Sequence, residues 1–264
     1  MEQPLPTRVA RPASIASLPW DGFDAYLFDI DGTLLNCRDT VHYNAFHSAL
    51  RQAWNCQHKI DGLPLHGNTD IGILRAAATA GGVTEEEFRR RLPQALAILR
   101  DEVERHADSF RPELCPSITA LLEHLHGNGK LLGVTSGAIE PVGWGKLRAA
   151  GLARYFSLGS FSADTAAVSG AAAHADDLKG CNETRAGIFR HGIKQARCRL
   201  GEHATVCFVG DTPADIAAAK SLETPILAVA TGIYDVETLH GQGPDLCLPC
   251  CDWLFAADPT AGLQ

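Results

Sequence analysis

The chain has 264 residues, of which 45% are hydrophobic and 20% are charged, and it carries a formal net charge of −8. This length allows a substantial core and suits one larger domain or a domain with a sizeable insertion, and it does not indicate a repeat array. The negative charge and the scattered Lys and Arg argue against the basic face that nucleic-acid binders usually carry. We therefore expect a small-molecule partner and no nucleic acid.

The start of the chain predicts a flexible tail over residues 1–20. Four prolines interrupt residues 1–19, which lack the continuous apolar stretch of a signal peptide. No run in the chain approaches the roughly 18 apolar residues that a bilayer-spanning helix requires. We expect a cytoplasmic protein that has no membrane partner and is a monomer or a homodimer.

Nine cysteines in a chain without a secretory signal are interpreted as reduced thiols. Cys247, Cys250 and Cys251 cluster, but a structural zinc site needs four ligands, and the sequence offers no second pair at a suitable spacing. We interpret these three as thiols at the end of a late strand and in the turn after it.

Short β-branched or aliphatic runs predict five strands, most of them followed by a helical pattern. The runs are AYLFDI near 25–30, KLLGVT near 130–135, YFSLG near 155–159, TVCFVG near 205–210 and PILAVA near 225–230. One predicted helix starts at Pro116, ends at Gly127 or Gly129, and has an apolar face of Leu114, Ile118, Leu121 and Leu125. A later one has an apolar face of Phe189, Ile193, Ala196 and Leu200. Strands that alternate with helices predict an α/β fold, a Rossmann-like parallel sheet sandwiched by helices.

The alternation stops between residues 37 and 115, where the pattern is helical only. Because this segment interrupts the first crossover between strands, we predict a small inserted all-α cap over 37–115. The core then comprises 21–36 and 116–257, followed by a C-terminal tail over 258–264.

Within the cap, one helix is predicted with particular clarity. Its apolar stripe consists of Leu92, Leu96, Leu99 and Val103. Thr84, with Glu87 three residues later, has the form of a capping box. In the core, by contrast, residues 162–183 are rich in Ala, Asp and Gly and predict a long loop that is either mobile or part of the site.

Two carboxylates, Asp29 and Asp31, end the first apolar run in the stretch FDIDGTLL, and Gly32 follows them at once. A buried strand should carry these acids to the rim of a parallel sheet, where α/β proteins bind ligands. A D-x-D pair alone also occurs in sugar-nucleotide enzymes and in ordinary turns. Further polar residues stand at the ends of later strands or at the start of a helix: Thr135, Arg185, Asp211 and Asp215.

Together these segments resemble the haloacid dehalogenase superfamily, whose members mostly transfer phosphoryl groups through an aspartyl-phosphate intermediate. DIDGTL resembles the first motif of that superfamily, Thr135 the second, a basic residue the third, and GDTPADIAAA the fourth. The stretch GAIEPVGWGKLRAAGLARYF and the helical insertion resemble the phosphoglycolate phosphatase and β-phosphoglucomutase group, which has a helical cap. The resemblance covers the core from about residue 24 to residue 235.

The resemblance implies a role for each acid. Asp29 would be the nucleophile, and Asp31 would protonate the leaving group and later deprotonate the attacking water. Asp31 also favours phosphate esters over haloacids, since the dehalogenases of this superfamily lack it. Magnesium, which prefers oxygen ligands, would bind Asp29, Asp211 and the backbone carbonyl of Asp31. Asp215 either caps a helix with Thr212 and Pro213 or also orients the metal shell.

Other residues would bind the phosphoryl group or select the substrate. The hydroxyl of Thr135 and the amide of Ser136 would bind a phosphoryl oxygen, and Gly32 leaves room for the phosphate. Arg185 is the preferred third-motif cation and Lys179 the alternative. In the cap, His66 and Asp70 are candidate substrate-binding residues, and His42 is a weaker candidate. The stretch around Lys146 lacks the glycine and the Ser or Thr of a P-loop, so no nucleotide-cradling role is expected.

The leading hypothesis is a Mg²⁺-dependent phosphatase that hydrolyses a small phosphorylated metabolite, with phosphoglycolate suggested by resemblance. One alternative is a phosphosugar mutase of the β-phosphoglucomutase type, whose cap usually offers a basic residue for a second phosphate. A catalytically idle binding member of the superfamily is another. A sugar-nucleotide transferase built on the D-x-D pair is the most distant, because it leaves Asp211 and Thr135 without a role.

Overall fold

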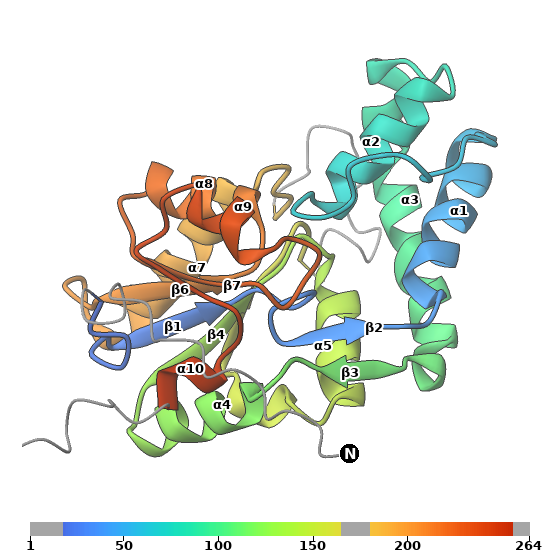
Figure 1. The fold of residues 1–264 in the computed structure, drawn as a ribbon. Coiled ribbons are helices and arrows are strands. Elements are labelled where there is room, and N and C mark those ends of the chain that lie inside the picture. The colour runs from blue at the N-terminus through green and yellow to red at the C-terminus, as the bar shows by residue number, and fades with distance from the viewer. Residues whose placement is uncertain (1–17, 165–179, 256–264) are drawn as a thin grey trace, which may run out of the picture.

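A parallel six-stranded sheet forms the centre of the molecule (Figure 1). We describe a computed structural model, which covers residues 18–164 and 180–255. The strand order is β5-β4-β1-β6-β7-β8, and each neighbouring pair runs parallel. The strands are β1 (Ala25–Phe28), β4 (Leu131–Thr135), β5 (Leu158–Ser160), β6 (Val206–Gly210), β7 (Ile226–Val229) and β8 (Leu246–Leu248). The predicted α/β fold class is confirmed.

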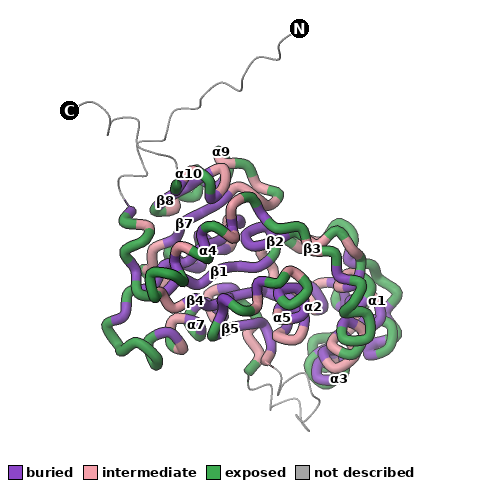
Figure 2. Tube along the Cα trace, turned by 90° about the horizontal axis from the view of Figure 1, so that it is seen from below, coloured by how far each residue is buried: buried purple, intermediate pink, exposed green. Residues whose placement is uncertain are grey.

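Helices cover both faces of this sheet, as Figure 1 shows. Successive side chains of β1 point to opposite faces, so Tyr26 and Phe28 pack in one hydrophobic cluster while Ala25 and Leu27 pack in another. The first cluster includes residues of α4 (Ile118–Gly127), α5 (Glu140–Ala149) and α10 (Asp252–Phe255). The second includes residues of α7 (Arg185–Leu200), α8 (Pro213–Ser221) and α9 (Val236–His240). Buried and exposed stretches alternate along the chain accordingly (Figure 2).

The register of the three central strands places their carboxyl ends side by side. Phe28 of β1 pairs with Val134 of β4 on one side and with Val209 of β6 on the other. The polar residues that follow these strands must therefore meet at one edge of the sheet. This alignment builds the floor of the site described below.

A separate helical unit lies at one end of the sheet (Figure 1). It consists of α1 (Val41–Trp54), α2 (Asp70–Ala80) and α3 (Glu85–Arg105), with a short 3-10 turn, η2 (Ala107–Ser109), after α3. A two-stranded antiparallel ribbon of β2 (Leu35–Cys37) and β3 (Pro112–Leu114) joins it to the core. The helices occupy the segment predicted for the cap, and the domain boundaries remain a prediction.

The predicted stripe of α3 forms the centre of the cap. All four side chains, Leu92, Leu96, Leu99 and Val103, are buried. The Thr84 hydroxyl accepts a hydrogen bond from the Glu87 amide, as expected. The reciprocal half of the capping box is replaced by ion pairs, because the Glu87 carboxylate binds Arg90 and Arg91.

Two details of the predicted helices are wrong. Leu114 belongs to β3 and is 42% exposed, because pairing with β2 holds this segment extended until α4 begins at Ile118. Leu200, at the end of α7, is 46% exposed, since the buried face of that helix ends at Ala196.

Most of the predicted loop over residues 162–183 lies outside the described residues. Its two described ends are joined by backbone hydrogen bonds from Asp164 to Gly180 and from Asn182 to Ser162. A second 3-10 turn, η3 (Ala153–Tyr155), precedes β5. The nine cysteines are free thiols. None of the helices in the described ranges has the length and apolar character needed to cross a membrane.

Candidate active site

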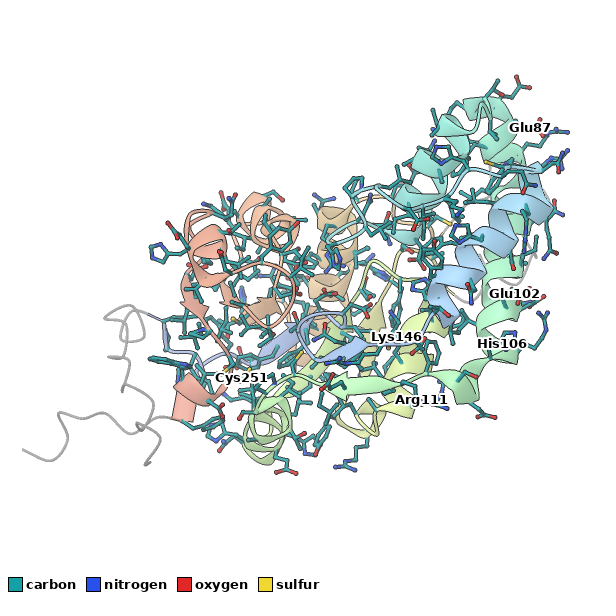
Figure 3. The ribbon with its side chains drawn as sticks, turned by 45° about the vertical axis from the view of Figure 1, so that its right-hand side comes forward. Glu87, Glu102, His106, Arg111, Lys146 and Cys251 are labelled. Atoms are coloured by element: carbon teal, nitrogen blue, oxygen red, sulfur yellow. The ribbon has the colours of Figure 1, made fainter. Side chains whose placement is uncertain are left out.

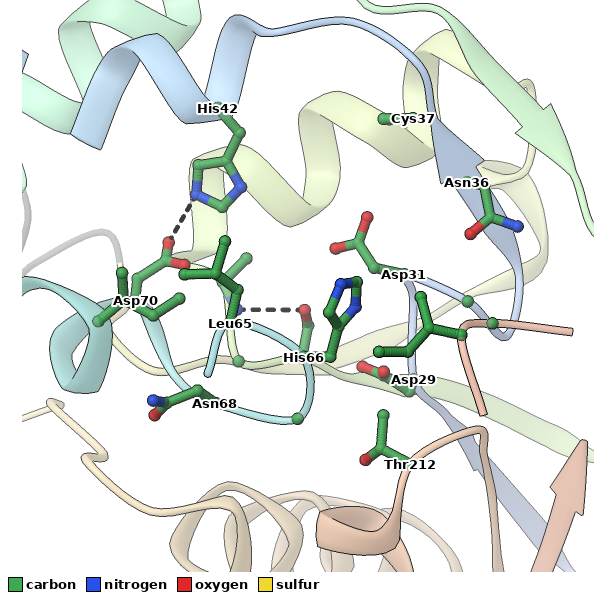
Figure 4. Close-up of a pocket in the computed structure, with 18 of the residues that line it drawn as sticks. Asp29, Asp31, Asn36, Cys37, His42, Leu65, His66, Asn68, Asp70 and Thr212 are labelled. Atoms are coloured by element: carbon green, nitrogen blue, oxygen red, sulfur yellow. Dashed lines mark hydrogen bonds and ion pairs between the residues drawn. The ribbon is translucent and has the colours of Figure 1, made fainter. Parts of the chain in front are cut away.

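A cleft of about 320 Å³ lies between the carboxyl edge of the sheet and the helical unit (Figure 4). Its core side carries charged and polar groups, among them Asp29, Asp31, Ser136 and Asp211. The cap side is mixed: apolar residues such as Phe46, Ile60 and Leu65 stand beside polar ones, which include His42, His66, Asn68 and Asp70. A small ligand bound in this cleft would contact charged groups on the core side and a mixed apolar and polar surface on the cap side.

Asp29 lies on the floor of the cleft, directly after β1, and its side chain is 6% exposed. Its amide donates to the carbonyl of Val209, which extends the strand pairing by one residue. The Nη2 atom of Arg185 lies 2.7 Å from one oxygen of the Asp29 carboxylate. Burial raises the pKa of Asp29, while the charge of Arg185 opposes the rise and Asp215 adds to it.

Arg185 joins two acids at the amino end of α7. Its Nε lies 2.6 Å from the Asp215 carboxylate, while an Nη of the same planar group binds Asp29. Thr184 caps the start of the helix by accepting a hydrogen bond from the Gly187 amide. This cap fixes the backbone position of Arg185, the next residue. Burial lowers the pKa of Arg185, but both carboxylates outweigh this and raise it overall. The guanidinium is therefore a permanent cation beside the proposed nucleophile.

Three carboxylates converge beside this arginine. Asp29, Asp211 and Asp215 each offer an oxygen within 4.8 Å of the others. Asp211 follows β6, and one of its oxygens accepts a hydrogen bond from the Thr33 hydroxyl at 2.9 Å. Burial and then the charge of Asp29 raise the pKa of Asp211 well above its ordinary value. Oxygen ligands concentrated in this way fit a hard divalent cation, which would offset the repulsion among the three carboxylates.

Asp215 takes a structural position within this group. One oxygen binds Arg185, and the other accepts hydrogen bonds from the Thr212 amide and hydroxyl at 3.1 and 2.7 Å. Thr212 in turn accepts from the Asp215 amide, so the predicted cap of α8 is a complete capping box. Both oxygens of Asp215 are occupied and the residue is fully buried. Asp215 therefore binds Arg185 but does not line the cleft.

Gly32 is required by the close approach of Asp211. Its φ of +88° is unfavourable for other residues, and a Cβ built on it would lie 2.2 Å from the nearest Asp211 oxygen. Thr231 donates a hydrogen bond at 2.6 Å to the Gly32 carbonyl and so holds this turn against the loop after β7.

Asp31 lies apart from the three converging acids. Both of its oxygens accept hydrogen bonds from the Lys146 ammonium, each at 2.7 Å. Surrounding protein raises the pKa of Asp31, but the charge and hydrogen bonds of Lys146 outweigh this and lower it overall. The carboxylate is 45% exposed within the cleft, whereas Lys146 behind it is only 5% exposed. Figure 3 shows Lys146 in the interior, while Glu87 and Glu102 point outward from α3.

Sequence reasoning missed Lys146, although a signal was present. Lysine is rarely buried without a partner, and Lys146 follows Val142 by four residues on the same face of α5. That face is the buried one, so a lysine there predicts a nearby carboxylate. Which carboxylate it meets cannot be read from the sequence, because the two residues are 115 positions apart.

The two residues expected to bind a phosphoryl oxygen differ in position. Ser136 lines the cleft, and its hydroxyl accepts a hydrogen bond from the Ala138 amide. Thr135 is fully buried, its methyl group lies toward Gly192, and its hydroxyl has no hydrogen-bond partner among the described residues. Ser136 is therefore on the cleft wall, but its amide, which was expected to bind a phosphoryl oxygen, instead donates to the Ser160 carbonyl at 2.9 Å. The phosphate contact of Thr135 remains a prediction.

The cap residues singled out from the sequence also reach the cleft. His66 is exposed and lines it. Asp70 is buried, and its carboxylate accepts hydrogen bonds from the Ile139 amide at 2.9 Å and contacts the His42 ring at 3.1 Å. Figure 4 shows this His42–Asp70 pair on the opposite side of the pocket from Asp29. The alternative cation, Lys179, lies outside the described residues.

Comparison with known proteins identifies the family. The model of the haloacid dehalogenase-like hydrolases matches residues 23–222, which include Asp29, Arg185 and Asp211. The chain therefore belongs to the haloacid dehalogenase-like hydrolase family. No curated protein gives a significant sequence match.

Solved structures support the same fold. A predicted phosphatase from Clostridium acetobutylicum is 19% identical with a TM-score of 0.60, and the match covers 88% of this chain and 96% of that one. CbbY from Rhodobacter sphaeroides, solved with phosphate, is 16% identical with a TM-score of 0.60, covering 86% and 94%. β-Phosphoglucomutase from Clostridium difficile is 18% identical with a TM-score of 0.57, covering 88% and 93%. At these identities the similarity defines the fold, and the function has to be argued from the site.

Proposed function

We propose that this protein is a Mg²⁺-dependent phosphatase that hydrolyses a small phosphate ester through phosphorylated Asp29. The observation that carries the proposal is the different environment of two acids that are two residues apart. Asp29 is buried against a permanent cation and next to Asp211, whereas Asp31 faces the cleft and binds a lysine. One acid is therefore placed for covalent attack and the other for proton transfer.

In the first step, an Asp29 oxygen attacks phosphorus and the bond from phosphorus to the ester oxygen breaks. Asp31, protonated at this point, gives its proton to the departing oxygen. In the second step, Asp31 accepts a proton from water as the water oxygen attacks phosphorus, and the bond to Asp29 breaks. Arg185 stays beside Asp29 throughout and offsets the negative charge of the transferring group.

Asp29 and Asp211, together with the backbone carbonyl of Asp31, would hold the magnesium ion. When bound, it supplies positive charge between the nucleophile and the phosphate, which otherwise repel each other. The Ser136 hydroxyl, on the cleft wall, would donate a hydrogen bond to a phosphoryl oxygen. The ion pair with Lys146 favours ionised Asp31, which suits the base role in the second step and makes the acid role more costly. This cost should be smallest for esters with a good leaving group, because such a group needs little protonation as it departs.

The cleft also bears on the mutase alternative. A mutase must hold a second phosphate, which calls for a cation that is free to bind it. Among the described residues that line the cleft, the lysine and arginine side chains are Lys146 and Arg185, and both are already paired with core carboxylates. This pairing favours a substrate with one phosphate over a substrate that needs a second phosphate to be held.

The test is phosphate release from a panel of phosphorylated metabolites in the presence of magnesium. We expect turnover of at least one small monoester, lost when magnesium is removed by a chelator. Release from no member of the panel, together with failure to bind beryllofluoride, would favour an idle binding member instead. Interconversion of sugar phosphates faster than phosphate release would favour the mutase.

A further inference from the structure

Lys146 is a buried cation that takes no direct part in the bond-making steps of the proposed reaction. It lies on α5, a helix that the core holds closely: a Cβ on Gly143 would lie 2.3 Å from the Phe161 ring, and one on Gly145 would lie 3.2 Å from the Phe110 ring. These contacts fix the helix, and with it the position from which the lysine stem projects. The ammonium group is thereby held at one point beneath the cleft.

Within residues 18–164 and 180–255, the charge of Lys146 has one close acceptor. Its ammonium binds both oxygens of Asp31 at 2.7 Å. Cys37 is also near, but burial raises the pKa of its thiol to about 12, so it stays neutral. Asp70 is engaged elsewhere, with the His42 ring and the Ile139 amide. The two buried cations of the cleft are therefore divided, with Arg185 on the nucleophile and Lys146 on the second acid.

We propose that Lys146 is a positioning residue that holds the Asp31 carboxylate in the orientation from which it exchanges protons with the leaving group and the attacking water. This inference rests on the proposed phosphatase function. Lys146 reaches the edge of the cleft, but its side chain is only 5% exposed and its ammonium is held against both oxygens of Asp31, so we expect it to act through Asp31. A two-oxygen contact fixes the rotation of the carboxylate as well as its place.

The variant Lys146→Met keeps the length of the stem and removes the ammonium. With an alkyl phosphate, we expect kcat/KM to fall about 30-fold, or about 2 kcal/mol of transition-state stabilisation, because the loss of a fixed orientation for the proton donor outweighs the easier protonation of Asp31 once the ammonium is gone. With nitrophenyl phosphate, whose leaving group needs little protonation, kcat/KM should fall less than about threefold. Val142→Ala, which removes buried volume one turn earlier on the same helix, controls for packing and should leave the ratio of the two substrates unchanged.

A double-mutant cycle shows whether Lys146 acts through Asp31. In an Asp31→Asn background, adding Lys146→Met should change alkyl phosphate turnover by less than about twofold, since the group that it positions is already gone. Additive losses would overturn the inference. So would a rise in KM with unchanged kcat in the single variant, because that pattern indicates direct contact with the substrate.

A measurement without turnover separates this inference from the proposed function. In ¹⁵N-lysine-labelled protein, we expect one ammonium resonance that exchanges slowly with water, is absent from Lys146→Met and moves in Asp31→Asn. If no such resonance exists, the inference is overturned even in an active enzyme. If the resonance behaves as described but no ester is hydrolysed, the pairing is supported and the phosphatase proposal fails.

Discussion

The two sides of the cleft are built on different physical principles. On the core side, buried charges are paired at fixed distances: Arg185 lies 2.7 Å from Asp29, and Lys146 lies 2.7 Å from Asp31. On the cap side, apolar residues stand beside the exposed His66 and the His42–Asp70 pair, and no lysine or arginine of the described cap residues lines the cleft. A buried pair tolerates little change, since removing one partner leaves a charge without compensation. We propose from this contrast that the core side carries out the chemistry and that the cap side selects the substrate.

The largest effect should follow from Asp29→Asn, which removes the proposed nucleophile and keeps its shape. We expect turnover to be lost, because an amide cannot form the phosphorylated intermediate. The melting temperature should stay within a few degrees, since Arg185 keeps its contact with Asp215. Phosphate release and thermal unfolding by circular dichroism measure the two effects. Activity within about tenfold of the parent, a barrier change of only about 1.4 kcal/mol, would contradict the assignment.

Arg185→Met tests whether the core side depends on its charge pairs. The change leaves Asp29 and Asp215 buried without their cation, so the free energy of unfolding at pH 7.5 should fall by about 3–5 kcal/mol. Urea unfolding measures this. The matched control is Arg190→Met, an exposed arginine of the same helix, which should change stability by about 0.5 kcal/mol or less. Equal losses of unfolding free energy in the two variants would show that the buried ion pairs of Arg185 stabilise the fold no more than an exposed arginine does.

The raised pKa values predict how stability depends on pH and on metal. Burial raises the pKa of Asp29 from 3.8 to about 7 in the metal-free protein. Between these values the folded state binds more protons than the unfolded state, so this group makes folding less favourable as the pH rises from about 4 to about 7. Below about pH 4 the carboxyl is protonated in both states and the penalty is absent.

Magnesium should relieve the same penalty. Protons compete with the ion for the carboxylates. Addition of about 10 mM Mg²⁺ should therefore raise the melting temperature about twice as much at pH 7.5 as at pH 5. Asp211→Asn, which removes one of the converging acids, should reduce the shift at both pH values. A shift that is equal at both pH values, or that survives this substitution, would place the ion elsewhere.

The smallest effect is expected on the cap side. His66→Ala removes an exposed side chain from the cleft wall, so the KM for the best substrate should change by about fivefold or less, which is about 1 kcal/mol. The kcat and the melting temperature should stay as they are. If kcat falls instead while KM stays unchanged, the cap would share in the chemistry, and the contrast between the two sides would be lost.

The sequence predicts the core side of the site well, because its residues follow apolar runs. Asp29 and Asp211 each end such a run, and parallel strands bring their carboxyl ends to one edge. The family match over residues 23–222 agrees with that interpretation. The fold class follows from the same alternation of strands and helices.

Other features depend on contacts that a single sequence does not contain. The ribbon of β2 and β3 has three residues in each strand, too few for a periodic signal. Whether Ser136 or Thr135 faces the cleft depends on where the strand ends, since neighbouring side chains point to opposite sides. The partner of Lys146 is set by tertiary packing alone. Each of these features depends on contacts between segments that are far apart in the sequence and close together in the folded chain.

Chemical trapping can detect a phosphoryl group that is bound transiently to Asp29. The Asp31→Asn variant, in which hydrolysis of the intermediate should be slow, would be mixed with substrate and magnesium, quenched rapidly and reduced with borohydride. Hydride reduces an acyl phosphate to an alcohol, which converts the modified aspartate into homoserine. We predict homoserine at position 29 in the peptide mass spectrum, dependent on substrate. Homoserine at another aspartate, or none while turnover proceeds, would contradict the account.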